Sequence, residues 1–187
     1  MKGKASKENA QSGQLFDELL VTMAKSGDRD AARRLALRWH PRLARAARRL
    51  LQDEEAALAA TQEAWLSILR SMASLRDPSR FAPWAFGILR RRCADSIRKA
   101  SRERAIIAPE EAAPPASSPA MQDEALAITQ AFASLPPDQN LAAHLYFAEG
   151  LTLAEIAEAL NVPLGTAKSR LFHARRKLKA ALTGEDQ

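Results

Sequence analysis

Six basic side chains and no acidic one lie between Leu164 and Ala180, near the C-terminal end of the sequence. A solvated helix ordinarily mixes both signs of charge, whereas an unmixed basic row is suited to contact the phosphates of a polyanion. At the start of this segment, Gly165 and Thr166 would let backbone amides and a hydroxyl approach a phosphate. The pattern indicates a DNA-contacting surface, with a solvated basic helix at the chain end as the alternative. The six residues are Lys168, Arg170, Arg175, Arg176, Lys177 and Lys179.

This basic segment is predicted to be the second helix of a helix-turn-helix. Thr152 followed by Glu155 fits a capping box, in which each side chain satisfies a backbone N–H at a helix start. Asn161 to Pro163 would end the first helix, and the second would run from Leu164 to about Leu182. Two helices joined by such a short turn are typical of this motif. The apolar side chains of the second helix recur every three or four positions and would face the first helix: Ala167, Leu171, Ala174 and Leu178.

The positive charge of the chain is concentrated in its first half. Residues 1–100 hold 20 basic and 11 acidic side chains, a net charge of +9, whereas residues 123–187 have a net charge of −2. In the helix expected over residues 28–52, arginines line one face and have few acids to pair with. A second nucleic-acid surface would explain this excess, and a merely soluble arginine face is the alternative. The face consists of Arg34, Arg38, Arg42, Arg45 and Arg49.

Apolar residues recur at helical spacing through the chain and strand-like alternation is absent, so an all-α protein is expected. Residues 1–14 are polar and are predicted to be a disordered tail. Helices are predicted near residues 15–24, 28–52, 53–72 and 80–99, which form a first small domain over residues 15–100. A flexible, proline-rich linker over residues 101–122 would separate it from a second domain, residues 123–187, that contains the helix-turn-helix.

The composition argues against several classes of site. Cys93 is the single cysteine, which excludes an internal disulfide, and with three histidines no metal cluster is indicated. No run of about 18 apolar residues and no signal peptide is visible. A Gly-rich phosphate loop, a Cys/His pair and a carboxylate dyad are also absent from the sequence. We therefore expect a soluble cytoplasmic protein that is not an enzyme and needs no metal or cofactor.

The second domain closely resembles region four of bacterial sigma factors, and the extracytoplasmic-function group is the nearest match. The matching motifs are Leu135-Pro136-Pro137, Glu149-Gly150-Leu151-Thr152, Glu155-Ile156-Ala157, Gly165-Thr166-Ala167-Lys168-Ser169-Arg170-Leu171 and Ala174-Arg175. The resemblance implies that this domain reads the minus-thirty-five promoter element in the major groove. If Arg170 is bidentate to a guanine, replacing it should cost about 1–3 kcal/mol. The implied DNA contacts are Gly165, Thr166, Lys168, Ser169, Arg170, Phe172, His173, Arg175 and Arg176.

The helix predicted near residues 53–72 resembles the region-two helix with which sigma factors hold the clamp of core RNA polymerase. The likeness is carried by Gln62-Glu63 followed by Trp65-Leu66. It implies polymerase contacts by Gln62, Glu63 and Leu66. The family commonly has acids at two positions where this chain has Ala56 and Ala59.

The helix predicted near residues 80–99 is similar to the promoter-melting helix of the same family. Its matching residues are Phe81, Trp84, Ile88, Asp95 and Arg98, and Arg91 replaces a more usual Asn. Base stacking and phosphate contacts can offset the cost of unstacking a base. The aromatic residues would also make an ordinary core. The residues implied at the minus-ten element are Arg80, Phe81, Trp84, Arg91, Arg92, Asp95 and Arg98.

The two resemblances together imply a sigma factor that directs core RNA polymerase to promoter DNA. By the same analogy an anti-sigma factor is expected to hold the protein until a signal releases it. Two other functions are open on the residues alone. One is a helix-turn-helix regulator that acts without polymerase, and the other is a decoy that mimics a sigma factor to titrate an anti-sigma partner.

Overall fold

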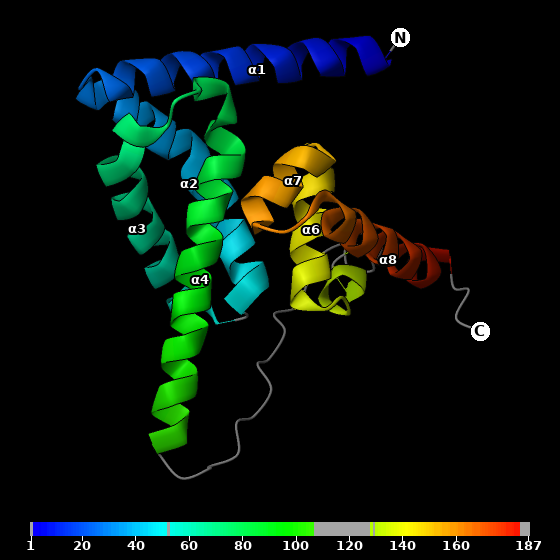
Figure 1. Ribbon diagram of the computed structural model, residues 1–187. Coiled ribbons are helices and arrows are strands. Elements are labelled where there is room, and N and C mark those ends of the chain that lie inside the picture. Colours follow the sequence, from blue (N-terminus) through cyan, green and yellow to red (C-terminus); the bar gives the residue numbers. More distant parts are fainter. Residues whose placement is uncertain (1, 52, 107–127, 129, 184–187) are drawn as a thin grey trace.

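The computed structural model describes residues 2–51, 53–106, 128 and 130–183, and it is all-α over these residues, as expected. Figure 1 shows α1 lying across one end of the molecule, α2, α3 and the long α4 beneath it, and the C-terminal helices packed beside α4. The elements are α1 (Lys2–Lys25), α2 (Arg29–Leu51), α3 (Glu54–Ser71), η1 (Met72–Ser74), η2 (Pro78–Arg80), α4 (Phe81–Ile106), α6 (Pro137–Phe147), α7 (Leu153–Leu160) and α8 (Leu164–Thr183).

Several helix starts follow directly from capping side chains in the sequence. Oδ1 of Asp28 accepts hydrogen bonds from the backbone N–H groups of residues 30 and 31, at 2.9 and 3.0 Å. Asp53 caps α3 by accepting from the N–H of Ala56 at 2.7 Å. The carboxylate of Asp77 accepts from Ser79, and these hydrogen bonds hold the pKa of Asp77 below its ordinary value. These caps satisfy backbone N–H groups that have no partner within the helix.

Two predicted boundaries differ from the structure. Residues 2–14 of the tail predicted to be disordered belong to α1, which begins at Lys2. That segment contains no proline, and about half of it is Lys, Ala or Gln, which are favourable in helices. The predicted linker begins too early, because α4 continues to Ile106. The rest of the predicted linker, residues 107–122, lies outside the described residues.

Helices α1 to α4, here called domain one, enclose an aromatic core. The Trp39 side chain of α2 is 3% exposed and makes edge-on contacts with Phe81 and Phe86 of α4, at ring-centroid distances of 5.1 and 6.1 Å. Leu35, Leu43 and other apolar side chains of α2 complete the buried face. Such contacts bury large apolar areas and fix how α2 and α4 cross.

The described part of the second domain, residues 128 and 130–183, is called domain two and is packed against domain one. Buried side chains of α4 and α7 belong to one continuous apolar cluster, which includes Phe86, Leu89, Ile156 and Leu160. The two helices approach closely at Gly87, where an added Cβ would lie 3.5 Å from the carbonyl oxygen of Ala159. The two predicted domains are therefore docked on each other in this structure.

The single cysteine is chemically protected. Cys93 on α4 is 1% exposed, and burial raises the pKa of its thiol to about 12. The thiolate is the reactive form, so almost none is present at neutral pH. Cysteines introduced on the surface can consequently be labelled selectively.

Candidate nucleic-acid interface

Helices α7 and α8 form the predicted helix-turn-helix. The capping box is present in full, with Glu155 Oε2 accepting from the Thr152 N–H at 2.8 Å and the Glu155 N–H donating to Thr152 Oγ1 at 3.3 Å. Asn161 ends α7 with a φ of 49°, a left-handed conformation that Asn tolerates better than most residues. Ala167, Leu171, Ala174 and Leu178 are buried, as their spacing predicts, but Ala174 and Leu178 pack in a cluster with Ala131, Leu135 and Ala143 and not against α7.

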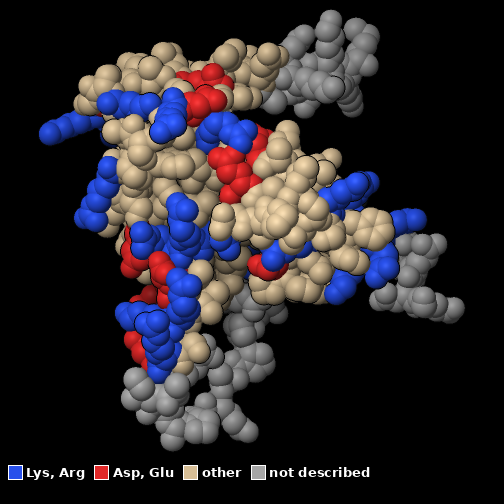
Figure 2. Space-filling model, in the orientation of Figure 1, with Lys and Arg blue, Asp and Glu red and all other residues tan. Residues whose placement is uncertain are grey.

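The opposite side of α8 is open and basic. Figure 2 shows blue side chains gathered toward the outer end of this helix. Phe172 is 62% exposed, which is unusual for an aromatic side chain and marks a candidate contact surface. Thr166 and Arg170 are half-buried, whereas the other predicted minus-thirty-five residues are exposed: Gly165, Lys168, Ser169, Phe172, His173, Arg175 and Arg176.

Arg170 differs from this exposed group. Its guanidinium lies 2.5 Å from Oδ2 of Asp138 on α6, and its side chain is 24% exposed. Arg170 thus ties the recognition helix to the helix behind it. To bind a guanine as the sequence predicts, it would have to leave this carboxylate.

The predicted minus-ten residues of α4 separate into two groups. Arg91 is exposed, and Arg92 donates from Nε to Ser67 of α3 at 3.2 Å. Asp95 pairs with both Arg92 and Arg98 along the same helix. These four residues form a charged surface on α4, which Figure 2 shows as blue side chains interrupted by red ones.

The other group lies at the start of α4, beside domain two. Phe81 is 2% exposed and packs on Trp39, so the structure places it in the core instead of on the DNA-facing surface. Trp84 is half-buried, with its ring centroid 6.0 Å from that of Phe81. Arg80 forms an ion pair with Glu158 of α7. At this end of the predicted minus-ten surface, domain two thus engages Arg80, whereas Phe81 is buried by Trp39 of domain one itself.

The arginine face of α2 also has partners that its sequence does not reveal. Arg38 donates to Asp17 of α1 at 2.7 Å, and the guanidinium of Arg49 lies 5.0 Å from the ring centroid of Phe132. Burial, followed by the charge of Arg45, lowers the pKa of Arg49. Arg42 and Arg45 both face Glu149. Most of this face is thus neither free for DNA nor simply solvated in the docked chain.

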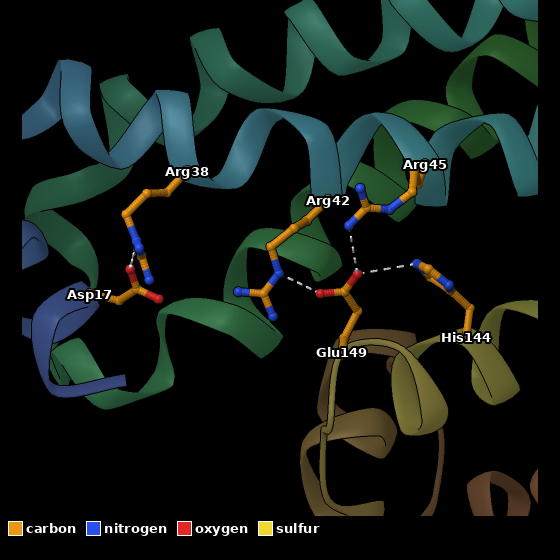
Figure 3. Close-up of polar contacts among 6 residues, drawn as sticks. All are labelled: Asp17, Arg38, Arg42, Arg45, His144 and Glu149. Atoms are coloured by element: carbon orange, nitrogen blue, oxygen red, sulfur yellow. Dashed lines mark hydrogen bonds and ion pairs between the residues drawn. The ribbon is translucent and has the colours of Figure 1, made fainter. Parts of the chain in front are cut away.

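Glu149 is the carboxylate at the centre of this contact (Figure 3). Its side chain is 1% exposed, and its oxygens lie 2.5 Å from Arg42 Nε and 3.9 Å from Arg45 Nη2. Nε2 of His144, on α6, lies 3.3 Å away. Burial raises the pKa of Glu149, but the approach of His144 and the charge of Arg42 outweigh it and hold that pKa below its ordinary value. The carboxylate is therefore ionised and binds two cations of domain one.

The depressed pKa of Glu149 predicts how docking depends on pH. The ionised carboxylate favours docking above its ordinary pKa of 4.5, and this contribution is lost as the pH falls through the lower value of the docked state. Energy transfer between dyes on Ala59→Cys and Lys177→Cys should therefore fall once the pH drops below 4.5. Glu149→Gln should lack this dependence. An identical pH profile for both proteins would contradict the assignment.

The predicted polymerase-binding residues lie together on one exposed face of α3. Gln62 and Glu63 are exposed, and Leu66 is 53% exposed. Leu58 and Leu69, at 51% and 49% exposure, extend this face along the helix. An exposed apolar row of this kind is suited to bind another protein.

Three carboxylates of domain two have specific partners that were not predicted from the sequence: Asp138, Glu149 and Glu158. Their partners are 32 to 107 residues away along the chain, so no local spacing could identify the pairs. One signal was available in the charge distribution. Domain two is acidic outside α8, and the arginine face of domain one lacks enough acids of its own.

Comparison with known proteins finds a matching family for each of the two domains. Residues 35–103 match Sigma-70 region 2, and residues 125–178 match Sigma-70 region 4. The ECF RNA polymerase sigma factor SigM of Mycobacterium tuberculosis is 34% identical over 167 residues, which cover 89% of this chain and 84% of that protein. The chain belongs to the ECF group of sigma-70 factors.

Two further relatives of this chain are also sigma factors. The ECF RNA polymerase sigma-E factor of Escherichia coli is 27% identical over 181 residues, covering 89% of this chain and 94% of that one. The sigma factor RpoE of Bartonella quintana, solved with the anti-sigma factor NepR, superposes with a TM-score of 0.66 at 25% identity, covering 83% of this chain and 98% of that one. Sigma factors bind core RNA polymerase and direct it to promoters, and they are not an enzyme class. Among the described helices, none has the length and apolar character to cross a membrane.

Proposed function

We propose that α8 of this sigma factor lies in the major groove of the minus-thirty-five element. The observation that carries the proposal is the exposed basic side of α8, held in place by a complete capping box and a buried apolar side. Lys168, Ser169, Phe172 and His173 are at the exposed N-terminal part of α8, the part that contacts base edges in this motif. Arg175 and Arg176, one turn further on, bind phosphates.

In domain one, α4 contacts the minus-ten element and α3 binds the polymerase. Arg91, Arg92 and Arg98 supply positive charge along α4, and the half-buried Trp84 is the aromatic side chain there that can reach a base. The exposed row of Gln62, Glu63 and Leu66 on α3 contacts core polymerase. Because Ala56 and Ala59 replace acids that are common in the family, this contact relies on apolar area, which Leu58 and Leu69 add.

An anti-sigma factor holds this protein in the cytoplasm until promoters are to be used. The Bartonella quintana relative, which was solved with its anti-sigma factor, supports this regulation. The chain has no catalytic role of its own, and the polymerase carries out RNA synthesis.

A reconstituted transcription assay tests the function. The protein, bacterial core polymerase and a library of genomic fragments are combined, and transcript start sites are mapped. Starts that share two spaced upstream elements are expected, and Phe172→Ala should abolish them while leaving the folded state intact. If the folded protein binds polymerase but yields no starts, the decoy function replaces this proposal. If it acts on promoters without binding polymerase, the regulator function does.

A further inference from the structure

Domain two presents carboxylates to arginines of domain one at two separate places. Glu149, in the turn before α7, lies between Arg42 and Arg45. Glu158, near the end of α7, pairs with Arg80. Figure 2 shows one group of red side chains in the centre of the view, where α7 meets domain one.

Two of these three arginines line one cleft, and Arg45 follows Arg42 by one turn of α2. Arg42 and Arg80 both line a cleft of about 680 Å³ between α1, α2, the start of α4 and domain two. Asp17, which pairs with Arg38, and Glu18 of α1 also line the cleft. Arg38 and Ser79 line it too, so guanidinium groups and a hydroxyl converge there. These are the groups with which proteins bind DNA phosphates. The cleft also adjoins the start of α4, where the proposed minus-ten surface begins.

The charge of domain two is divided between its two sides. Between Leu164 and Ala180, α8 carries six basic residues and no acid. The described acids of domain two are Asp138, Glu149, Glu155 and Glu158, and all of them precede α8. Three of them line the cleft or pair with its arginines: Glu149, Glu155 and Glu158. The basic side of domain two, on α8, thus has a charge opposite to that of DNA. Its acidic side has the same negative charge as DNA.

We propose that Arg42, Arg45 and Arg80 form a phosphate-binding site for promoter DNA, which Glu149 and Glu158 occupy in the docked chain. A carboxylate and a phosphate oxygen accept the same bidentate hydrogen bonds from a guanidinium, so one can replace the other. When the domains separate on the polymerase, the arginines lose their carboxylates and bind phosphates beside the minus-ten element. This inference rests on the proposed function and adds α2 to its DNA-binding surface.

The site also explains the excess of arginine on α2. Arg42 is positioned by the ring of Trp39, whose centroid lies 3.8 Å from the guanidinium carbon. An arginine held in this way loses little freedom when it exchanges one anion for another. In the docked chain the exchange is blocked, because the Glu149 side chain is 1% exposed and cannot be reached by DNA.

The first test measures promoter binding by the protein–polymerase complex over a range of salt concentrations. Each phosphate contact contributes about 0.9 to the slope of log K against log salt. Arg42→Ala with Arg45→Ala should therefore make this negative slope shallower by about 2. The corresponding double lysine variant should keep most of the wild-type slope. Arg33→Ala is the matched control, because it lies nine residues before Arg42 and so on the opposite side of α2.

An unchanged slope in a folded double alanine variant that still binds polymerase would overturn the proposal. This result differs from failure of the proposed function, in which the wild-type complex itself binds no promoter. Circular dichroism of each variant establishes folding.

A second test uses the free chain and a fluorescent DNA duplex of arbitrary sequence. Glu149→Gln with Glu158→Gln removes the competing charges and should tighten binding on the order of tenfold, within the usual range of coupling between sites. Adding Arg42→Ala and Arg45→Ala should cancel this gain. If the double glutamine variant gains nothing, or if the gain survives without the arginines, the carboxylates do not occupy a phosphate site.

Discussion

Replacing Trp39 with alanine is expected to lower the free energy of unfolding by about 3–5 kcal/mol. Trp39 is 3% exposed and touches both Phe81 and Phe86, so truncation would leave a cavity where α2 crosses α4. A typical domain has only about 5–15 kcal/mol of stability, so this loss would be a large part of the total. Urea unfolding followed by far-ultraviolet circular dichroism measures it.

Two control variants separate packing from other effects. Trp39→Phe keeps a ring in the core and removes the indole N–H, which is buried without a hydrogen-bond partner among the described residues. Its cost should stay below about 1.5 kcal/mol. Phe172→Ala removes an exposed ring and should leave stability within about 0.5 kcal/mol. If Trp39→Ala costs no more than Trp39→Phe, the aromatic contact does not hold α2 on α4.

Local sequence determined much of the helix-turn-helix, which made it predictable. The Thr152–Glu155 capping box spans four residues, and the buried side of α8 follows from a helical repeat within that helix alone. The same holds for Asp28 and Asp53, whose caps act on the next few residues. Motifs of this kind need no knowledge of distant parts of the chain.

The role of the arginine face could not be predicted in this way. Arg42 and Glu149 are 107 residues apart, and they meet because α7 packs on α4 and α6 packs on α2. The sequence shows a net positive charge in domain one and a net negative charge in domain two. It does not show that carboxylates of domain two pair with arginines of domain one. Arg170 is a similar case, since its partner Asp138 lies on another helix.

Docking and DNA binding are linked by these shared groups. The apolar contact between α4 and α7 brings domain two to the start of α4, and the carboxylates then neutralise the arginines that lie there. The exposed side of α8 is not used in docking. A docked chain can thus keep its minus-thirty-five surface accessible while part of its proposed minus-ten surface is covered.

Replacing Glu149 with lysine is expected to separate the two domains without unfolding either. The new ammonium group would lie beside Arg42, Arg45 and His144 with no acid to pair with it. Leaving one partner of a buried ion pair uncompensated costs about 3–5 kcal/mol. Separation relieves this cost at once, because both arginines and the lysine then face water. The exposed Arg80–Glu158 pair adds at most about 1 kcal/mol and would not prevent it.

Energy transfer between dyes on Ala59→Cys and Lys177→Cys measures this separation, and the buried Cys93 does not interfere with labelling. Transfer should be largely lost in Glu149→Lys, while helical content is retained. Glu63→Lys makes the same charge change at an exposed position of α3 and should leave transfer unaltered. Adding Arg42→Glu to Glu149→Lys restores an opposite-charge pair and should recover part of the signal, as expected for directly coupled residues. Full transfer in Glu149→Lys alone would mean that the apolar α4–α7 contact holds the domains together without the ion pair.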